Sequence, residues 1–189
     1  MIFSLKAIVS FVLGAALASA NSVTFVNQDA TKRTLVFTPD ISHQPIGDVI
    51  VPSFQEVAVN FPASWIGNVY SVSEGAPRVD GMLAEFVFQG FQGMTFFDVS
   101  AIVNPHDHDG IHELYPASQK GLKEKQNVSG CVVFPCNTAY YHPDDVQTHA
   151  SVEMDFICTL GTYSNTTEVV TRDDQSELVA RRFVLGKFF

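Results

Sequence analysis

Short runs of β-branched and aromatic residues, each closed by Gly, Pro, Asn or Asp, recur along most of the chain. Runs of this kind predict strands, and their spacing is typical of an all-β sandwich or barrel rather than of alternating strands and helices. Sixteen Phe residues fit the half-buried surfaces of such sheets. The predicted strands are 22–26, 33–38, 49–51, 56–61, 67–72, 83–88, 95–103 and 151–158.

The alternation fades between residues 104 and 141, where Gly, Pro, Asn and Lys accumulate. We expect a loop-rich region there, with one helical turn around 114–125. A chain of 189 residues suits a single well-filled core, and it shows no internal repeat. The expected organisation is a signal peptide over 1–20, a β-sandwich domain over 21–165, and a C-terminal tail or short helix over 166–189.

The first twenty residues have the pattern of a secretory signal. Lys6 precedes an apolar run over 7–17, and the sequence ASA at 18–20 is a small-residue cleavage site. The mature chain is then expected to begin at Asn21 and to be secreted, either free outside the cell or in the cell wall. Sequons at Asn127 and Asn165 predict N-glycosylation, in agreement with this route.

Three cysteines in an oxidising compartment imply one disulfide and one free thiol. The sequence does not determine the pairing. Cys136 and Cys158 both lie near the ends of predicted elements, so a bond between them is favoured over one between Cys131 and Cys136.

Acidic residues outnumber basic ones by 20 to 11, which gives a formal net charge of −9. A chain with this charge repels the phosphate backbone, so nucleic acid is not an expected partner. No apolar run reaches the length of a membrane span. We expect a monomer that needs no cofactor.

The segment 83–103 holds two alternating runs around the sequence GFQG at 90–93. A tight hairpin centred there places Phe86 opposite Phe97, and Glu85 directly opposite Asp98. Opposed carboxylates repel each other unless a cation, a shared proton or solvent stabilises them. The pair is therefore a solvated feature of an open sheet face, a binding or catalytic pair in a cleft, or a metal-bridging pair.

Several short motifs support a resemblance to a known family. The hairpin has LAEF at 83–86, GFQG at 90–93 and FFDVS at 96–100, and the flanking matches are VTFVN at 23–27, FPASWIG at 61–67, CNTAY at 136–140 and DFIC at 155–158. In order, these segments resemble the thaumatin-like (osmotin) family. With so few cysteines, the chain is most similar to the small members secreted by filamentous fungi.

The resemblance implies a β-sandwich of about ten strands with a loop-rich lobe beside an acidic cleft. It also implies antifungal, glucan-binding or weak β-1,3-glucanase activity. The chain departs from the family in its cysteine count, and it lacks an Arg at 70–72 and an Asp at 103–105 that the cleft usually includes. Asp144 and Asp145 match the family's late acidic pair, and Trp65 is a candidate sugar-stacking residue beside its more ordinary role in a core.

The sequence HDHDGIHE at 106–113 concentrates groups that bind Zn²⁺ or Cu²⁺. The candidate ligands are His106, His108 and His112. Their spacing matches no zinc motif, and the neighbouring Pro and Gly indicate a turn. A solvated polar loop is the stronger interpretation, and no metal is expected.

We expect a secreted, non-enzymatic protein that binds β-glucan, or another cell-wall or host component, through an acidic face around Glu85 and Asp98. The enzyme alternative is a weak retaining endo-β-1,3-glucanase. In that case Glu85 acts as the general acid and Asp98 as the nucleophile or base. A third class, a toxin or effector that acts on another organism, has the same sequence features.

Overall fold

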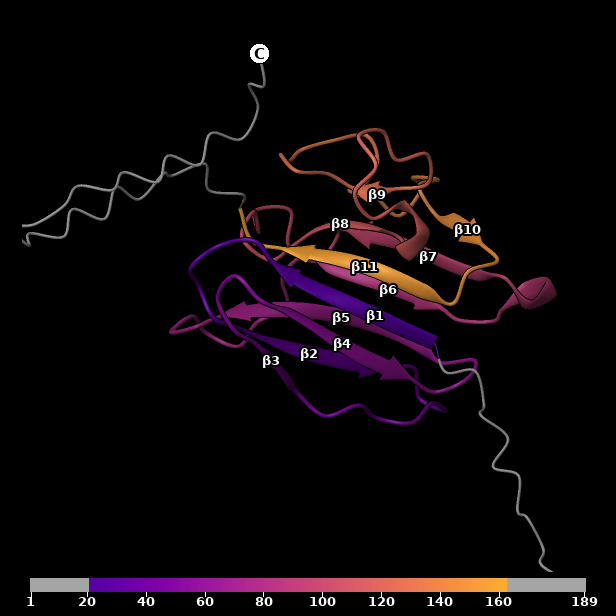
Figure 1. Cartoon of the computed structure of the whole chain (residues 1–189), viewed down its shortest axis with the longest axis horizontal. Helices are drawn as coiled ribbons and strands as arrows, with labels where there is room; N and C mark the ends of the chain where they lie inside the picture. Colours follow the sequence, from indigo (N-terminus) through magenta and orange to yellow (C-terminus); the bar gives the residue numbers. More distant parts are fainter. Residues whose placement is uncertain (1–20, 163–189) are drawn as a thin grey trace, which may run out of the picture.

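The computed structural model describes residues 21–162, which form two β-sheets with very little helix. The five-stranded sheet has the order β4-β1-β11-β8-β9 and the six-stranded sheet the order β10-β7-β6-β5-β2-β3 (Figure 1). The predicted all-β class is confirmed. The predicted signal peptide and C-terminal segment lie outside the described residues.

Most strands coincide with the predicted runs. Their bounds are β1 Asn21–Asn27, β2 Arg33–Pro39, β3 Val49–Val51, β4 Glu56–Phe61, β5 Ile66–Ser73, β6 Leu83–Val87, β7 Thr95–Ser100, β8 Ile111–Pro116, β9 Ser129–Gly130, β10 His149–Ser151 and β11 Asp155–Leu160. Two single-turn 3-10 helices, η1 Phe91–Gly93 and η2 Ala117–Gln119, complete the described elements. Strands β8 and β9 fall within the region predicted to be loop-rich, while η2 confirms the helical turn expected there.

The two sheets face each other across one aromatic core. In β1 the side chains alternate between buried and half-buried, so that Phe25 points into the core. Phe25 meets Phe37 of the opposite sheet at 6.2 Å between ring centroids, and Phe97 meets Phe156 at 4.9 Å. Each such aromatic pair contributes about 0.5–1.5 kcal/mol beyond its buried area. The core therefore orients β6 and β7 firmly and leaves the opposite face of their sheet outside.

The β6–β7 hairpin has the predicted register. Phe86 pairs with Phe97, and Glu85 pairs with Asp98. The connection includes η1, and the backbone of Gln92 takes a positive φ of 57°. Gly90 N donates to Met94 O at 2.7 Å, which closes the turn. The predicted hairpin is confirmed, and with it the direct opposition of the two carboxylates.

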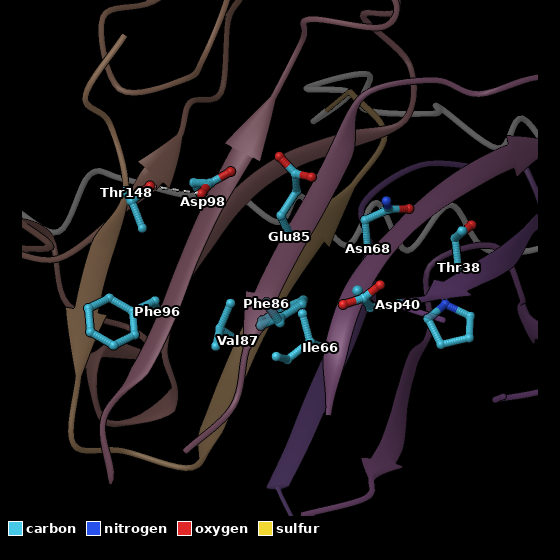
Figure 2. A pocket seen from close by; sticks show the side chains of 12 residues that line it. Thr38, Asp40, Ile66, Asn68, Glu85, Phe86, Val87, Phe96, Asp98 and Thr148 are labelled. Carbon is cyan, nitrogen blue, oxygen red and sulfur yellow. Dashed lines mark hydrogen bonds between the residues drawn. The ribbon is translucent and has the colours of Figure 1, made fainter. Parts of the chain in front are cut away.

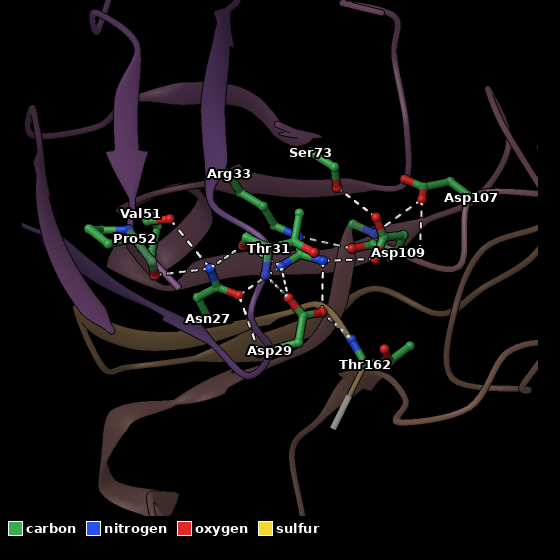
Figure 3. A network of polar contacts seen from close by, with 11 residues as sticks. Asn27, Asp29, Thr31, Arg33, Val51, Pro52, Ser73, Asp107, Asp109 and Thr162 are labelled. Carbon is green, nitrogen blue, oxygen red and sulfur yellow. Dashed lines mark hydrogen bonds and ion pairs between the residues drawn. The ribbon is translucent and has the colours of Figure 1, made fainter. Parts of the chain in front are cut away.

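A buried arginine joins the loops at one end of the two sheets (Figure 3). Arg33 is fully buried and donates to Asp29 Oδ1 at 2.6 Å, to Asn27 Oδ1 at 2.7 Å and to Asp109 Oδ1 at 2.7 Å. Thr162 N also donates to Asp29 at 3.1 Å. Although burial alone would raise it, the pKa of Asp29 is lowered because Arg33 and backbone amides stabilise its carboxylate. This network ties β1 and β2 to the turn before β8.

Candidate functional site

A row of polar side chains crosses the outer face of the six-stranded sheet. Thr38 pairs with Asn68, Asn68 with Glu85, and Glu85 with Asp98, so that adjacent strands place these side chains side by side. Thr148, just before β10, continues the row by donating to Asp98 Oδ2 at 3.1 Å (Figure 2). Because side chains alternate along a strand, the neighbouring aromatic residues point to the core instead.

An apolar row lies beside the polar one. Ile66 pairs with Val87 and Val87 pairs with Phe96, all three half-buried on the same outer face. Together the two rows form the floor of a groove of about 460 Å³. Pro39 and Asp40 also line it, and Asp40 lies on the side away from Asp98 and Thr148 (Figure 2). The groove therefore offers hydrogen-bonding groups along one line and apolar surface along the next.

Asp98 is the most deeply buried carboxyl in this groove, with 8% of its surface exposed. Burial, followed by the neighbouring charge of Glu85, raises its pKa to about 7, against the stabilising hydrogen bond from Thr148. When both carboxyl groups are ionised, Oδ1 of Asp98 is buried and has no donor. The neighbouring Glu85 therefore favours the protonated form of Asp98, whose carboxylic O–H can donate a hydrogen bond to a carboxylate.

Tyr140 fixes the outer end of the polar row. Its hydroxyl forms a hydrogen bond of 2.7 Å with Thr148 Oγ1 and accepts one from Thr148 N at 3.2 Å. Its backbone pairs with the end of β7, with Ala101 N donating to Tyr140 O at 2.7 Å. Tyr140 thus contacts both the backbone N–H and the hydroxyl of Thr148, and that hydroxyl also donates to Asp98.

The structure places the other predicted binding residues away from the groove. Trp65 is fully buried, packs against Phe61 at 5.0 Å between ring centroids, and donates through Nε1 to Gln44 O. Its ring is part of the core and is not presented to a ligand. Asp145 accepts two backbone N–H bonds that lower its pKa, and Asp144 is exposed in the same turn. Neither aspartate lines the groove.

The three candidate metal ligands of the 106–113 segment do not converge on one point. Within residues 21–162 no group of three or more His, Cys, Asp or Glu side chains is arranged to hold a metal ion. His106 and His108 are exposed, whereas His112 is buried in β8 with Nδ1 near the carbonyl oxygens of the disulfide loop. Asp107 accepts hydrogen bonds from backbone N–H groups that shape the turn, and Asp109 pairs with Arg33.

The disulfide joins Cys131 to Cys136, with 6.5 Å between their Cα atoms. The predicted use of Cys136 is confirmed, and the preference for Cys158 as its partner is wrong. Cys158 lies in the middle of β11, paired with Phe25 of β1 and Leu114 of β8, and its thiol is free and buried in the core. The registers of these strands therefore fix Cys158 inside the core, whereas Cys131 and Cys136 share a short loop.

Of the two predicted glycosylation sites, Asn127 lies within the described residues and Asn165 outside them. The side-chain amide of Asn127 donates to Ala150 O at 3.0 Å. Ser129 of the same sequon is buried in β9. Glycosylation at both positions remains a prediction.

Sequence reasoning found Glu85 and Asp98 but missed Thr38, Asn68 and Thr148. Thr38 and Asn68 stand in strands that were predicted, and their alternation already indicated an outer face. The order of the strands in the sheet was the missing information. Thr148 lies in a stretch with no alternating pattern, so the sequence held no signal for it.

The fold and the groove define a class: an all-β protein of two facing sheets, with a groove of mixed polarity on the outer face of one sheet. The particular family follows from a close relative, the antigenic protein SchS21 of Stachybotrys chartarum. The two are 46% identical over 140 residues, which is 74% of this chain and 94% of that protein. The chain belongs to the SchS21 family. No protein-family model matches it.

A solved structure supports the fold independently of close sequence similarity. The protein elicitor MoHrip2 of Magnaporthe oryzae superposes with a TM-score of 0.54 over 76% of this chain and 100% of its own, at 14% identity. The resemblance to the thaumatin-like family is therefore wrong, because the relative and the structural neighbour both lie outside that family. The motifs behind it are short strand and turn patterns, which unrelated sheets share. Among residues 21–162 there is no helix with the length and apolarity that a bilayer crossing requires.

Proposed function

We propose that this chain is a secreted fungal protein that binds a neutral cell-wall glycan, a segment of β-glucan, in the groove on the outer face of the six-stranded sheet. The observation behind the proposal is the polar row that runs beside the apolar row across this face. The leader-like sequence at 1–20 supports secretion. So do the names of an antigen and an elicitor among similar fungal proteins, which describe molecules that another organism meets.

The chemistry of the groove suits a sugar chain. A pyranose ring presents hydroxyl groups around its edge and apolar C–H groups on its faces. The polar row offers acceptors at Glu85 and Asn68 and hydroxyl groups at Thr38 and Thr148, while Phe96 offers an aromatic surface beside them. The row crosses four adjacent strands and ends at Thr148 beside β7. Its four intervals of about 4.8 Å make it roughly 19 Å long, which accommodates several sugar rings.

The charge of the groove favours a neutral ligand over an anionic one. Glu85, Asp98 and Asp40 line it, and no lysine or arginine of residues 21–162 does. An anionic polysaccharide would be repelled, whereas hydroxyl groups donate hydrogen bonds to carboxylates. Bonds of this type, to a charged acceptor, contribute about 1.5–3 kcal/mol each.

The test is the binding of soluble β-1,3-glucan oligosaccharides, measured by calorimetry on the wild type, Glu85→Gln and Phe96→Ala. We expect Glu85→Gln to weaken binding by about 1–3 kcal/mol, since it removes a charged acceptor. Glu124→Gln, at an exposed loop position, is the control and should bind as the wild type does. Unchanged affinity in Glu85→Gln and Phe96→Ala would remove the groove as the binding site. A wild type that binds no glucan would refute the glycan proposal and favour a protein ligand.

The weak retaining glucanase remains the second candidate because of one specific observation. The two carboxyl groups are directly opposed, and Asp98 keeps its proton up to about pH 7. In a hydrolase this assigns the general acid to Asp98 and the nucleophile to Glu85, the reverse of the roles expected from the sequence. We favour binding because Asp98 is buried and tethered to Thr148, whereas a general acid must reach the glycosidic oxygen. Release of reducing sugar by the wild type, abolished in Glu85→Gln, would reverse this preference.

A further inference from the structure

Asp98 differs from Asp29, the other buried acidic residue among those described, in having no cationic partner. Asp29 contacts Arg33 at 2.6 Å. Asp98 is more than nine-tenths buried, contacts no lysine or arginine within the described residues, and has a carboxylate oxygen, Oδ1, without any donor. A second carboxylate, Glu85, stands directly opposite on the next strand. An acidic pair with one buried member lacks the positive charge that would stabilise the ionised form of that member.

We propose that Glu85 and Asp98 together bind a divalent cation, Ca²⁺, between strands β6 and β7. Directly opposed residues have Cβ atoms about 4.5–5.5 Å apart, so their carboxylate oxygens can lie on either side of one ion. Ca²⁺ accepts oxygen ligands at about 2.3–2.6 Å and tolerates irregular geometry. The unpaired Oδ1 of Asp98 supplies a preformed ligand, and the half-exposed Glu85 supplies one that can adjust.

The donor set favours a hard cation. The groove side chains that carry donor atoms do so through oxygen: carboxylates at Glu85 and Asp98, an amide at Asn68 and a hydroxyl at Thr148. His149, on the strand beside β7, pairs with Phe97 and stacks on its ring at 5.7 Å between ring centroids, and it does not line the groove. Zn²⁺ and Cu²⁺ prefer nitrogen or sulfur ligands, and Mg²⁺ demands a near-ideal octahedron. Ligands from separate strands, completed by water, suit Ca²⁺ better.

The cation site goes beyond the proposed function and does not depend on it. The Ca²⁺ ion can bind in the absence of glycan, because both side-chain ligands belong to this chain. Ca²⁺ takes six to eight ligands in all, so an ion held by two carboxylates keeps positions open. In the groove those positions face the line along which sugar hydroxyl groups would bind. A bound Ca²⁺ would therefore cancel the repulsion between Glu85 and Asp98 and offer open positions that sugar hydroxyl groups can occupy.

The experiment is calorimetric titration of CaCl₂ into chelator-treated protein at about pH 8, where Asp98 is ionised. The wild type is expected to bind one Ca²⁺ per chain and to unfold at higher temperature in its presence. Both Glu85→Gln and Asp98→Asn should weaken the binding at least about tenfold, since each removes a charged ligand. The control Glu124→Gln removes an equal charge from an exposed loop and should bind Ca²⁺ normally.

Two outcomes would overturn the cation site: no saturable Ca²⁺ binding by the folded wild type, or equal binding by all four proteins, which would indicate unspecific attraction to a chain of net charge −9. Circular dichroism confirms that each variant is folded, and Glu85→Gln, at a half-exposed position, tests the site even if Asp98→Asn unfolds.

Glucan binding measured separately in EDTA and in CaCl₂ distinguishes the two proposals. Glucan bound without any Ca²⁺ site would refute only the cation proposal, and Ca²⁺ bound without glucan would refute only the glycan proposal.

Discussion

Replacing Asp98 by asparagine is expected to stabilise the protein in neutral and alkaline solution when Ca²⁺ is absent. Asp98 is buried opposite Glu85, which makes its ionised form unfavourable in the folded chain. The neutral asparagine side chain keeps the shape of the carboxyl group. Its carbonyl oxygen can accept from Thr148, and its amide group can donate to Glu85, as the protonated aspartic acid does.

The magnitude follows from the pKa of Asp98, which is raised from the ordinary 3.8 to about 7 in the folded protein. As pH rises, the unfolded chain releases this proton near pH 4, whereas the folded chain keeps it to about pH 7. The unfolded state is therefore favoured progressively between these values. The full pKa difference corresponds to about 4 kcal/mol of folding stability. This stability is lost between about pH 4 and pH 7, and the loss stays constant at higher pH. We expect Asp98→Asn to recover about 2–4 kcal/mol of this at about pH 8.

Urea unfolding in EDTA at a series of pH values between about 4 and 8 measures the effect. The free energy of unfolding of Asp98→Asn should exceed that of the wild type increasingly across this range. Burial lowers the pKa of His149 from 6.5, which makes stability rise with pH in the same range, but both proteins share this effect and it cancels in their difference. Asp29 has a lowered pKa, so its contribution is lost only as pH falls below about 4, outside this window. The reasoning would be refuted if the variant were no more stable than the wild type at about pH 8, or if the difference between them did not change with pH.

Two further predictions concern the fold. Arg33→Met should lower the free energy of unfolding by about 3–5 kcal/mol in urea titrations, because it leaves Asp29 buried without its partner. Lys32→Met, which breaks an exposed ion pair with Glu74, should cost less than about 1 kcal/mol, and equal effects would contradict a special role for Arg33. Burial raises the pKa of the Cys158 thiol, so mass spectrometry should find no maleimide adduct on the native protein and one adduct after unfolding without reductant. An adduct on the native protein would place this thiol at the surface.

The fold class and the central hairpin could be predicted because both depend on local patterns. The strand at 56–61 and the register of Glu85 with Asp98 follow from alternation and from one turn, which are short-range properties. Strand β8 could not be predicted in the same way. It is buried along almost its whole length, so its side chains do not alternate, and His112 and Glu113 give it the composition of a loop.

The groove depends on which strands are neighbours, and local patterns do not contain that information. Asn68 joins Glu85 because β5 lies beside β6, and Thr38 joins Asn68 because β2 follows on the other side. These contacts connect residues far apart in the chain. The sequence could therefore predict the two carboxylates at the centre of the site, but not the polar and apolar rows that make them part of a groove.

The wrong family assignment has a physical cause of the same kind. Many hairpins combine a turn flanked by glycines with paired aromatic residues on the buried face and a polar pair on the exposed face. A match over about twenty residues of such a hairpin therefore tests local sequence patterns and not the whole fold. The cysteine count tests more, because a lobe stabilised by many disulfides cannot persist in a chain with three cysteines. In this chain one disulfide closes a five-residue separation and the third cysteine is buried in the aromatic core. Stability must then come from the packing of the two sheets against each other. The low cysteine count is therefore stronger evidence against the thaumatin-like fold than the hairpin motif is evidence for it.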